Sequence, residues 1–430
     1  MQLMSQLCGT AVTWLLFLLG AAGAAPTDIR TILSGADWSE NTTIAYSGSA
    51  HFEHSTERWT IFDPPNYSAV LSPDEGLAID LGGLDCVHVD TGAGTVTVGG
   101  GATFADIYEP VFAAGYEIQI GSCSCPGVVG VTLGGGVGRY QSLHGLIIDA
   151  LVLVRLVTAD GAIATASETL NPELFWGIRG AGANFGIVTS ATYKLAPLIN
   201  DGLSLTADFV FPTEMTEAFF HPQILTNWVY AGSETEGRRI LGPLFELNPP
   251  FANATMIPWN RLVYTAGFGL NAAFCTGPAP RSIYTTTMRN LSADTYQAAF
   301  EKLSAFWEDV PAARGSAIEL EMLGRPASGV IPDAKTAYPW QDAVAYAMFQ
   351  MTWTDTSVAE QANTLARELR DDFAATSGYG GLAAYVSYAH GDEPIEAIYG
   401  EHKLQRLLAL KDSWDPDNVF GFNHALPRWY

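Results

Sequence analysis

Two cysteines and a run of glycines stand close together in the stretch GSCSCPGVVGVTLGGGVGRYQ, which spans residues 121–141. A cysteine thiol is a nucleophile that can bond covalently to a bound group. Glycine is needed where the backbone takes positive φ or where a bulky neighbour leaves no room for a side chain. The positions concerned are Gly134, Gly135, Gly136 and Gly138. The stretch therefore predicts a loop in which something bulky lies close to the backbone and within reach of a thiol.

The cysteines also have an ordinary structural explanation, in which Cys123 or Cys125 is a buried thiol or half of a disulfide. If Cys8 is removed with the apolar leader, only Cys86, Cys123, Cys125 and Cys275 remain, too few for a disulfide scaffold in a chain of 430 residues. No cysteine pair has CxxC spacing and no histidine lies at zinc-finger intervals from one. We therefore predict no metal site.

Composition limits the partners of the chain. With 48% hydrophobic residues in 430, there is enough apolar surface for two domains. The formal net charge is -24, and such a surface repels phosphate backbones and anionic lipids. We expect a small-molecule substrate and exclude nucleic acid as a partner. We also exclude membrane association of the mature chain.

The first 25 residues resemble a secretory signal peptide, because an apolar run over residues 11–25 ends in small residues before Pro26. The run carries no Lys or Arg, which leaves an uncleaved anchor or a buried N-terminal helix as alternatives. Four glycosylation sequons agree with secretion; they begin at Asn41, Asn66, Asn253 and Asn290. We expect a secreted, extracellular glycoprotein.

Hydrophobic periodicity predicts mixed strands and helices in the first half. Residues 78–99 alternate small and β-branched residues around glycine turns, which predicts consecutive short strands. Residues 102–116 have helical spacing, and residues 146–166 predict two strands joined by a turn at Asp160-Gly161. Residues 171–195 predict a short helix, a glycine loop and another strand. The fold class is therefore α+β.

The sequence pattern changes after about residue 197, where prolines separate aromatic, strand-like runs from amphipathic helices. Helices are predicted over residues 294–308 and 357–374. A further helix runs through Leu404 to Leu410 and is stopped by Asp415-Pro416. A second domain followed by a helical tail is the simplest organisation.

Four stretches together resemble one known family. They are residues 121–141, LHGLIIDALVLVRLVTADG at 143–161, NPELFWGIRGAGANFGIVTSATYKL at 171–195 and YGEHKLQRLLALKDSWDPDNVF at 399–420. Their order and spacing are similar to the berberine-bridge-enzyme-like branch of the vanillyl-alcohol-oxidase superfamily of flavoproteins. The resemblance covers residues 75–200 and 380–427.

The resemblance implies a two-part, PCMH-type FAD-binding domain assembled from both ends of the chain. It also implies a substrate domain whose antiparallel sheet, covered by helices, lies over the flavin ring. The expected divisions are a signal peptide at 1–25, the FAD-binding domain at 26–197, the substrate domain at 198–395 and a berberine-bridge-like segment at 396–430 that returns to the FAD domain.

The resemblance places Cys123 where some family members carry a thioether to the flavin C6 position, a bond that tethers the flavin and raises its oxidising power. The glycine stretch would offer backbone amides and a flat wall to the cofactor. Residues around position 187 would line the adenine, and Asn423 would reach the flavin unless it only caps a loop. The full set of expected FAD contacts is Gly121, Ser122, Cys123, Gly127, Gly130, Leu133, Gly134, Gly135, Gly136, Gly138, Gly186, Ile187, Val188 and Asn423.

The family oxidises an alcohol or amine carbon by hydride transfer to flavin N5, commonly with reoxidation by dioxygen. The segment YVSYAHGDE resembles the family's Tyr-x-Asn-Tyr strand, which makes Tyr385 the first candidate for the base and Tyr388 the second. A phenol needs a neighbouring group to act as a base, and Ser387 replaces the usual asparagine. Alternatively, the tyrosines only pack.

The chain departs from the family upstream of Gly76, where a strand, a helix and the pyrophosphate loop with its flavin-linked histidine are missing. His51 and His54 lack the Gly-Gly context, so no histidyl link is assigned. Either a real deletion or a missing exon explains the gap, and the clean breakpoints favour the exon. The alternative function is a secreted, flavin-free binding protein on the same scaffold.

Further departures are Trp340 and Gln341 in place of a basic pair, and His402 in place of an asparagine. A Rossmann site is excluded, because GAGANFG at 180–186 has the wrong glycine spacing and no acidic residue follows at the required interval. We predict an FAD-linked oxidase of a small alcohol-bearing metabolite or carbohydrate.

Overall fold

The computed structural model describes residues 44–46, 48–56, 79–212, 223–277, 279–324, 327–422 and 424–427. The predicted signal peptide, Asn41, Asn66, Asn423 and the region just upstream of Gly76 lie outside these residues. No helix within the described ranges is long and apolar enough to cross a membrane.

A five-stranded antiparallel sheet forms the centre of the N-terminal half, with strand order β1-β2-β6-β4-β5. Its strands are β1 (Val87–Asp90), β2 (Thr95–Gly99), β4 (Leu151–Val157), β5 (Ile163–Ser167) and β6 (Ile187–Lys194). The hairpin predicted over residues 146–166 is confirmed, since β4 and β5 pair across the Asp160-Gly161 turn. The first residues of that range form a short helix, α6 (Ile147–Ala150), with Leu146 as its N-cap.

Helices cover this sheet and bury its apolar face. The longer ones are α3 (Phe104–Ala113), α4 (Val128–Gly134), α7 (Pro172–Ala181) and α15 (Glu401–Trp414). Leu407 and Leu410 of α15 share one buried cluster with Phe175 and Trp176 of α7, so the C-terminal helix packs on the N-terminal half. The smaller elements are α2 (Ala50–Ser55), β3 (Tyr116–Glu117), α5 (Gln141–His144) and β7 (Ala196–Pro197).

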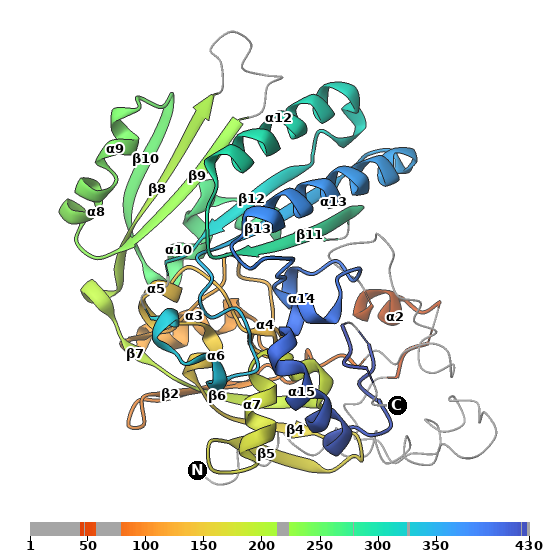
Figure 1. The fold of residues 1–430 in the computed structure, drawn as a ribbon. Coiled ribbons are helices and arrows are strands. Elements are labelled where there is room, and N and C mark those ends of the chain that lie inside the picture. The colour runs from red at the N-terminus through yellow and green to blue at the C-terminus, as the bar shows by residue number, and fades with distance from the viewer. Residues whose placement is uncertain are drawn as a thin grey trace.

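Two three-stranded antiparallel sheets form the other half of the molecule, at the end opposite the five-stranded sheet (Figure 1). One has the order β10-β8-β9 and the other β11-β13-β12. Their strands are β8 (Leu203–Pro212), β9 (Gln223–Ala231), β10 (Phe251–Pro258), β11 (Arg281–Met288), β12 (Ala317–Met322) and β13 (Ala345–Thr352). The mixed helix and antiparallel-sheet class is confirmed.

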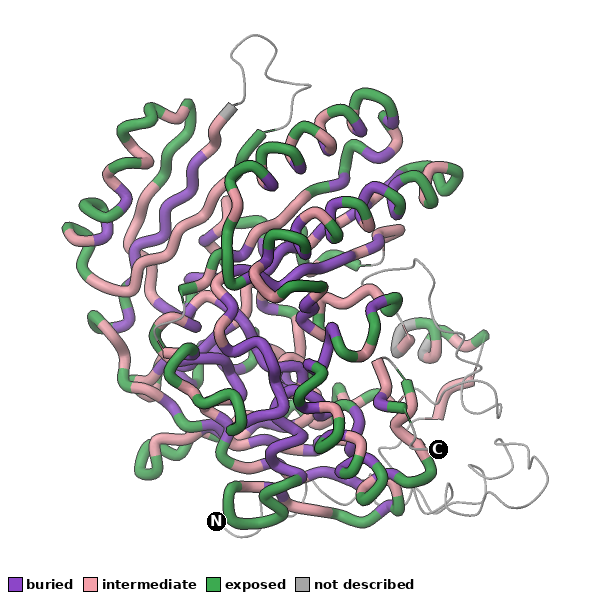
Figure 2. Tube along the Cα trace, viewed as in Figure 1, coloured by how far each residue is buried: buried purple, intermediate pink, exposed green. Residues whose placement is uncertain are grey.

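Helices pack on one face of each sheet. Helices α12 (Ala293–Asp309) and α13 (Ala359–Thr376) cover the second sheet through a buried apolar cluster, and both confirm the helices predicted there. The first sheet carries α8 (Glu234–Ile240) and α9 (Gly242–Glu246). Figure 2 shows buried residues concentrated around the five-stranded sheet and beneath these helices. The face of each sheet that these helices leave uncovered can therefore contact the N-terminal half.

Short segments join the halves. They are α10 (Trp259–Thr265), α11 (Asn271–Phe274), α14 (Ile395–Tyr399) and the 3-10 turn η9 (Val386–Tyr388). The strand expected around Tyr385 and Tyr388 was wrong. The Tyr388 amide donates back to the Tyr385 carbonyl at 2.9 Å, and this closes a turn in place of a strand ladder.

Candidate active site

The triple glycine lies against side chains of the protein itself. A Cβ atom on Gly135 would lie 2.8 Å from the Tyr338 ring, and one on Gly136 would lie 1.7 Å from Ile147. A Cβ on Gly134 would meet Val386 at 2.8 Å and Ser387 at 2.6 Å. Gly135 and Gly136 also have positive φ. The chain's own side chains therefore leave no room for a side chain at these three positions, and their contact with flavin stays a prediction.

The other predicted glycines divide into two groups. Gly138 is packed against the Ile120 carbonyl oxygen, 2.0 Å from a hypothetical Cβ, and Gly186 similarly approaches the Val157 carbonyl at 2.6 Å. By contrast, Gly130 has nothing within 4 Å of that position, and Gly121 and Gly127 have only ordinary contacts. Packing within the chain therefore does not require glycine at positions 121, 127 and 130. Ile187 and Val188, named with Gly186 for the adenine, begin β6 and pair with β4.

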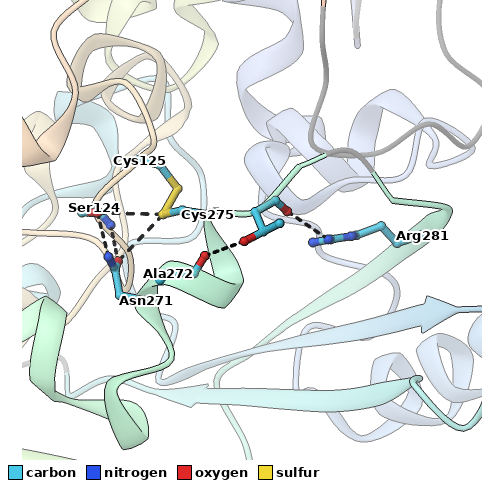
Figure 3. Close-up of a disulfide and its surroundings, with 7 residues drawn as sticks. Ser124, Cys125, Asn271, Ala272, Cys275 and Arg281 are labelled. Carbon is cyan, nitrogen blue, oxygen red and sulfur yellow. Dashed lines mark hydrogen bonds between the residues drawn. A yellow bond between two sulfur atoms is a disulfide. The ribbon is translucent and has the colours of Figure 1, made fainter.

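The alternatives for the two cysteines resolve differently. Cys125 forms a disulfide with Cys275, with Cα atoms 5.7 Å apart, and Figure 3 shows this bond beside Ser124 and Asn271. Cys123 keeps its thiol and is half-buried. The cysteine that the resemblance assigns to flavin is therefore the one left available for a covalent bond.

The Cys123 thiol lies in an acidic environment. Burial, and then the charges of Glu321 and Glu319, raise its pKa to about 11, while Arg139 opposes them. Each effect has a plain cause, since burial and nearby carboxylates both disfavour a thiolate. Cys123 is consequently a protonated, slowly reacting thiol at neutral pH.

Glu321 of β12 accepts hydrogen bonds from two hydroxyl groups that come from different parts of the chain. The Tyr388 hydroxyl donates to one carboxylate oxygen at 2.8 Å, and the Ser122 hydroxyl donates to the other. Withdrawal from water, and then the charge of Glu321, holds the pKa of Tyr388 well above its ordinary value. Tyr388 is therefore a neutral phenol with its proton already directed at a carboxylate.

Tyr385 has a different environment. Its ring is fully buried, and its hydroxyl accepts a hydrogen bond from the Gly136 amide at 3.2 Å. The ring packs edge-on against Tyr388 and Tyr338, with centroids 4.8 and 6.2 Å away. The Tyr385 hydroxyl thus holds the backbone at Gly136. Because, of the two tyrosines, only Tyr388 bonds to a carboxylate among the described residues, the geometry favours Tyr388 over Tyr385 for proton transfer.

Glu319 and Arg139 complete the charged cluster. Glu319 lies two residues before Glu321 on β12, so both side chains point from the same face of the strand. Arg139 follows the glycine stretch, and its Nη1 donates to Asn227 Oδ1 of β9 at 2.6 Å. Burial lowers the pKa of Arg139, and both glutamates counteract this. None of Glu319, Glu321 and Arg139 was predicted, although the alternation in AIELEM, residues 317–322, placed the two glutamates on one strand face.

The three departures from the family pattern serve the protein's own packing. Trp340 donates to the Ala384 carbonyl at 3.1 Å, and Gln341 donates to Thr336 at 3.3 Å. His402 is exposed and pairs with Asp333 at 3.0 Å. These side chains therefore bind neighbouring segments of the chain.

The raised pKa of Glu319 predicts that the stability of the protein depends on pH. Burial, and then Glu321, raise its pKa from 4.5 to about 7. The unfolded chain ionises this carboxyl near 4.5, so its contribution to stability is full below that pH and is lost as pH rises to about 7. We expect Glu319→Gln to raise the free energy of unfolding by about 1–3 kcal/mol at pH 8, and by less at pH 4. Urea unfolding at both pH values measures this, with the exposed Glu308→Gln as control; an equal gain at both pH values would contradict it.

Unpartnered polar atoms in this cluster indicate that a further group fits here. The buried Tyr108 hydroxyl and Arg139 Nε have no hydrogen-bond partner within the described part of the chain. Buried polar groups are normally bonded, so such atoms suit the oxygens and nitrogens of a ligand. Together with the half-buried Cys123 thiol, they fit a polar cofactor.

Comparison with known proteins identifies that cofactor. Residues 66–167 match the family of the FAD binding domain, and residues 384–427 match the family described as berberine and berberine like. The chain is 40% identical to FAD-linked oxidoreductase fogF of Aspergillus ruber, over 99% of this chain and 98% of that protein.

Solved structures show the same fold. BBE-like 1 of Physcomitrella patens aligns with a TM-score of 0.70 at 22% identity, over 82% of both chains. A xylooligosaccharide oxidase from Myceliophthora thermophila, solved with xylobiose, aligns with a TM-score of 0.69 at 21% identity, again over 82% of both chains. FAD is therefore the cofactor, and the chain belongs to the berberine-bridge-enzyme-like family of FAD-linked oxidoreductases.

Proposed function

We propose that this oxidoreductase removes a hydride from an alcohol or amine carbon of a small metabolite or carbohydrate, while Tyr388 and Glu321 remove the hydroxyl or amine proton. FAD, when bound, supplies the hydride acceptor at its N5 position. The observation that carries the proposal is the 2.8 Å hydrogen bond from Tyr388 to Glu321, next to Ser122 and Cys123. The solved relative with bound xylobiose supports carbohydrate as one substrate class.

The Tyr388–Glu321 pair explains how a phenol of raised pKa assists at neutral pH. A free tyrosinate is disfavoured by burial and by the glutamate charge. If Tyr388 accepts the substrate proton on its oxygen while passing its own proton to Glu321, no tyrosinate has to exist on its own. The supporting group is thus a carboxylate acceptor. This differs from the cation or hydrogen-bond donor usually expected beside a basic phenol.

We propose Cys123 as the covalent attachment point of the flavin, through a thioether to C6. Forming this bond would replace one S–H and one C–H bond and release two protons and two electrons, and the enzyme's electron acceptor would take up the electrons. Dioxygen is the acceptor we propose, with hydrogen peroxide as its product.

Acid precipitation tests the attachment. We expect the wild-type pellet to stay yellow and to yield a flavin peptide that contains Cys123, because a thioether survives denaturation. In Cys123→Ser the flavin should move to the supernatant, with at least a tenfold loss of pellet absorbance, since a hydroxyl is a far weaker nucleophile than a thiol. Flavin retained in the Cys123→Ser pellet would contradict the assignment, and a colourless wild type that gains no flavin from added FAD would favour the flavin-free alternative.

The comparison with fogF bears on the missing pyrophosphate-loop segment. The alignment runs over 493 positions and so is longer than the chain of 430 residues. The relative therefore carries residues that have no counterpart here. We propose that the segment upstream of Gly76 is among them and was lost with an exon; sequencing the transcript tests this.

We also propose that the protein is secreted and glycosylated. A disulfide persists in an oxidising compartment, which agrees with the Cys125–Cys275 bond. Asn253 in β10 and Asn290 after β11 are both exposed, as glycan acceptors must be. Expression in a eukaryotic secretory host, followed by glycosidase treatment, tests this through a fall in the mass of the secreted chain.

A further inference from the structure

The loop that carries Cys123 is held from both halves of the molecule. We call residues 121–127 the cysteine loop. On its own side, the Ala105 amide donates to the Ser124 carbonyl at 3.0 Å, and the Phe104 amide donates to the Pro126 carbonyl at 3.1 Å. These bonds fix the loop backbone to the start of α3. They restrain residues 124 and 126 and leave residue 123 to other contacts.

The other half of the molecule holds the two serines that flank Cys123. Ser122 donates to Glu321 of β12. The Ser124 amide donates to Asn271 Oδ1 at 2.9 Å, and Asn271 Nδ2 donates back to the Ser124 hydroxyl at 2.9 Å. Ser124 and Asn271 are both buried, so these reciprocal bonds are shielded from water.

The disulfide completes this attachment at the next residue. Cys125 joins Cys275, which directly follows α11, across 150 residues of sequence (Figure 3). The segment before α11 is itself anchored to α3, because Asn260 donates to Glu109 at 2.6 Å and Trp259 packs edge-on against Tyr108. The cysteine loop is therefore bonded to a segment that is itself attached to α3.

We propose that the Cys125–Cys275 disulfide and Asn271 form a clamp that positions the Cys123 thiol beside the Glu319–Glu321 pair. The proposal rests on the function proposed above for Cys123 and adds what aims that residue. The clamp has two roles. It joins the Cys125 and Cys275 sulfurs to each other, so Cys123 is the cysteine of the loop that keeps its thiol. It also fixes Ser124, so that Cys123 is held between two anchored serines.

Thiol reactivity measures the position of Cys123 directly. In the clamped loop the thiol is half-buried, and burial together with the two glutamates raises its pKa. A released loop would expose the sulfur to water and move it away from those carboxylates, so more thiolate would form and react. Loss of the clamp should therefore make Cys123 more reactive towards an external reagent.

The experiment compares full-length chains produced under riboflavin limitation, so that Cys123 is a thiol, and labels them with a maleimide at neutral pH. Mass spectrometry of the Cys123 peptide gives the rate. We expect Cys125→Ser/Cys275→Ser to be labelled about tenfold faster than wild type, because one unit of pKa gives tenfold more thiolate. Asn271→Ala keeps the disulfide and should show a smaller increase in the same direction.

A matched control separates positioning from general loss of stability. Leu303→Ala removes buried volume under α12, away from the cysteine loop, and should leave the Cys123 rate unchanged. An unchanged rate in the folded double variant would overturn the clamp. If circular dichroism shows that the double variant is unfolded, the Asn271→Ala rate decides, and a rate equal to wild type then overturns it.

The covalent flavin fraction distinguishes this proposal from the proposed function. In flavin-loaded protein we expect the clamp variants to retain less flavin in the acid pellet while still binding FAD without a covalent bond. If the wild type carries no flavin on Cys123, the proposed attachment fails, but the labelling rates still report whether the clamp positions the thiol.

Discussion

Glu321→Gln and Tyr388→Phe should each slow reduction of the flavin by substrate by roughly 10²-fold or more, the usual contribution of a positioned acid or base. Glutamine keeps the shape of the Glu321 side chain but is a poor proton acceptor. Phenylalanine keeps the ring of Tyr388 but removes the hydroxyl that connects substrate to carboxylate. Anaerobic stopped-flow, following the absorbance of oxidised flavin with an alcohol that reduces the wild type, measures the rate.

The double variant and Tyr385→Phe sharpen this test. If Tyr388 and Glu321 act as one relay, the double variant should be little slower than either single variant, because the second change removes nothing further. Tyr385→Phe loses the acceptor for the Gly136 amide, so we expect lower stability but less than a tenfold fall in rate. A large rate loss in Tyr385→Phe with a normal rate in Tyr388→Phe would return the base to Tyr385.

Lys411→Met should destabilise the protein by about 3–5 kcal/mol, because it leaves a buried carboxylate without its cation. Lys411 and Asp415 of the C-terminal region bond at 2.5 Å, with side chains only 3% and 0% exposed. Lys411 also donates to the carbonyls of Asn184 and Phe420, at 3.0 Å each. The change thus removes the charge that ties the C-terminal helix to the glycine loop before β6.

Urea unfolding of the flavin-free chain measures this loss as a shift of the transition midpoint. Lys335→Met is the matched control, since Lys335 and Glu168 lie 3.5 Å apart with both side chains more than half exposed. We expect that control to change the unfolding free energy by at most about 1 kcal/mol. If both variants lose a similar unfolding free energy, burial of the Lys411–Asp415 pair does not make it more stabilising than an exposed pair.

Elements with a strong local period were predicted within a few residues. The β4–β5 hairpin, α13 and α15 each carry a repeating apolar pattern and a clear stop signal, and these act over a few residues of chain. The turn at Val386–Tyr388 was missed because no local apolar period or stop signal marks it. The segment resembles a strand of the family, but Tyr385 and Tyr388 are three residues apart and the Tyr388 amide donates back to the Tyr385 carbonyl, so the chain closes a turn next to β11.

The sequence by itself determined the α+β class and the family, and it predicted site roles for Cys123, Tyr385 and Tyr388. Only the tertiary structure decided which tyrosine faces a carboxylate, which cysteine pairs with Cys275 and what the glycines accommodate. The physical reason is distance along the chain. Glu321 is 199 residues from Ser122 and 67 from Tyr388, and Cys125 is 150 from Cys275. Contacts of that range leave no local period in a sequence, and folding alone brings the partners together.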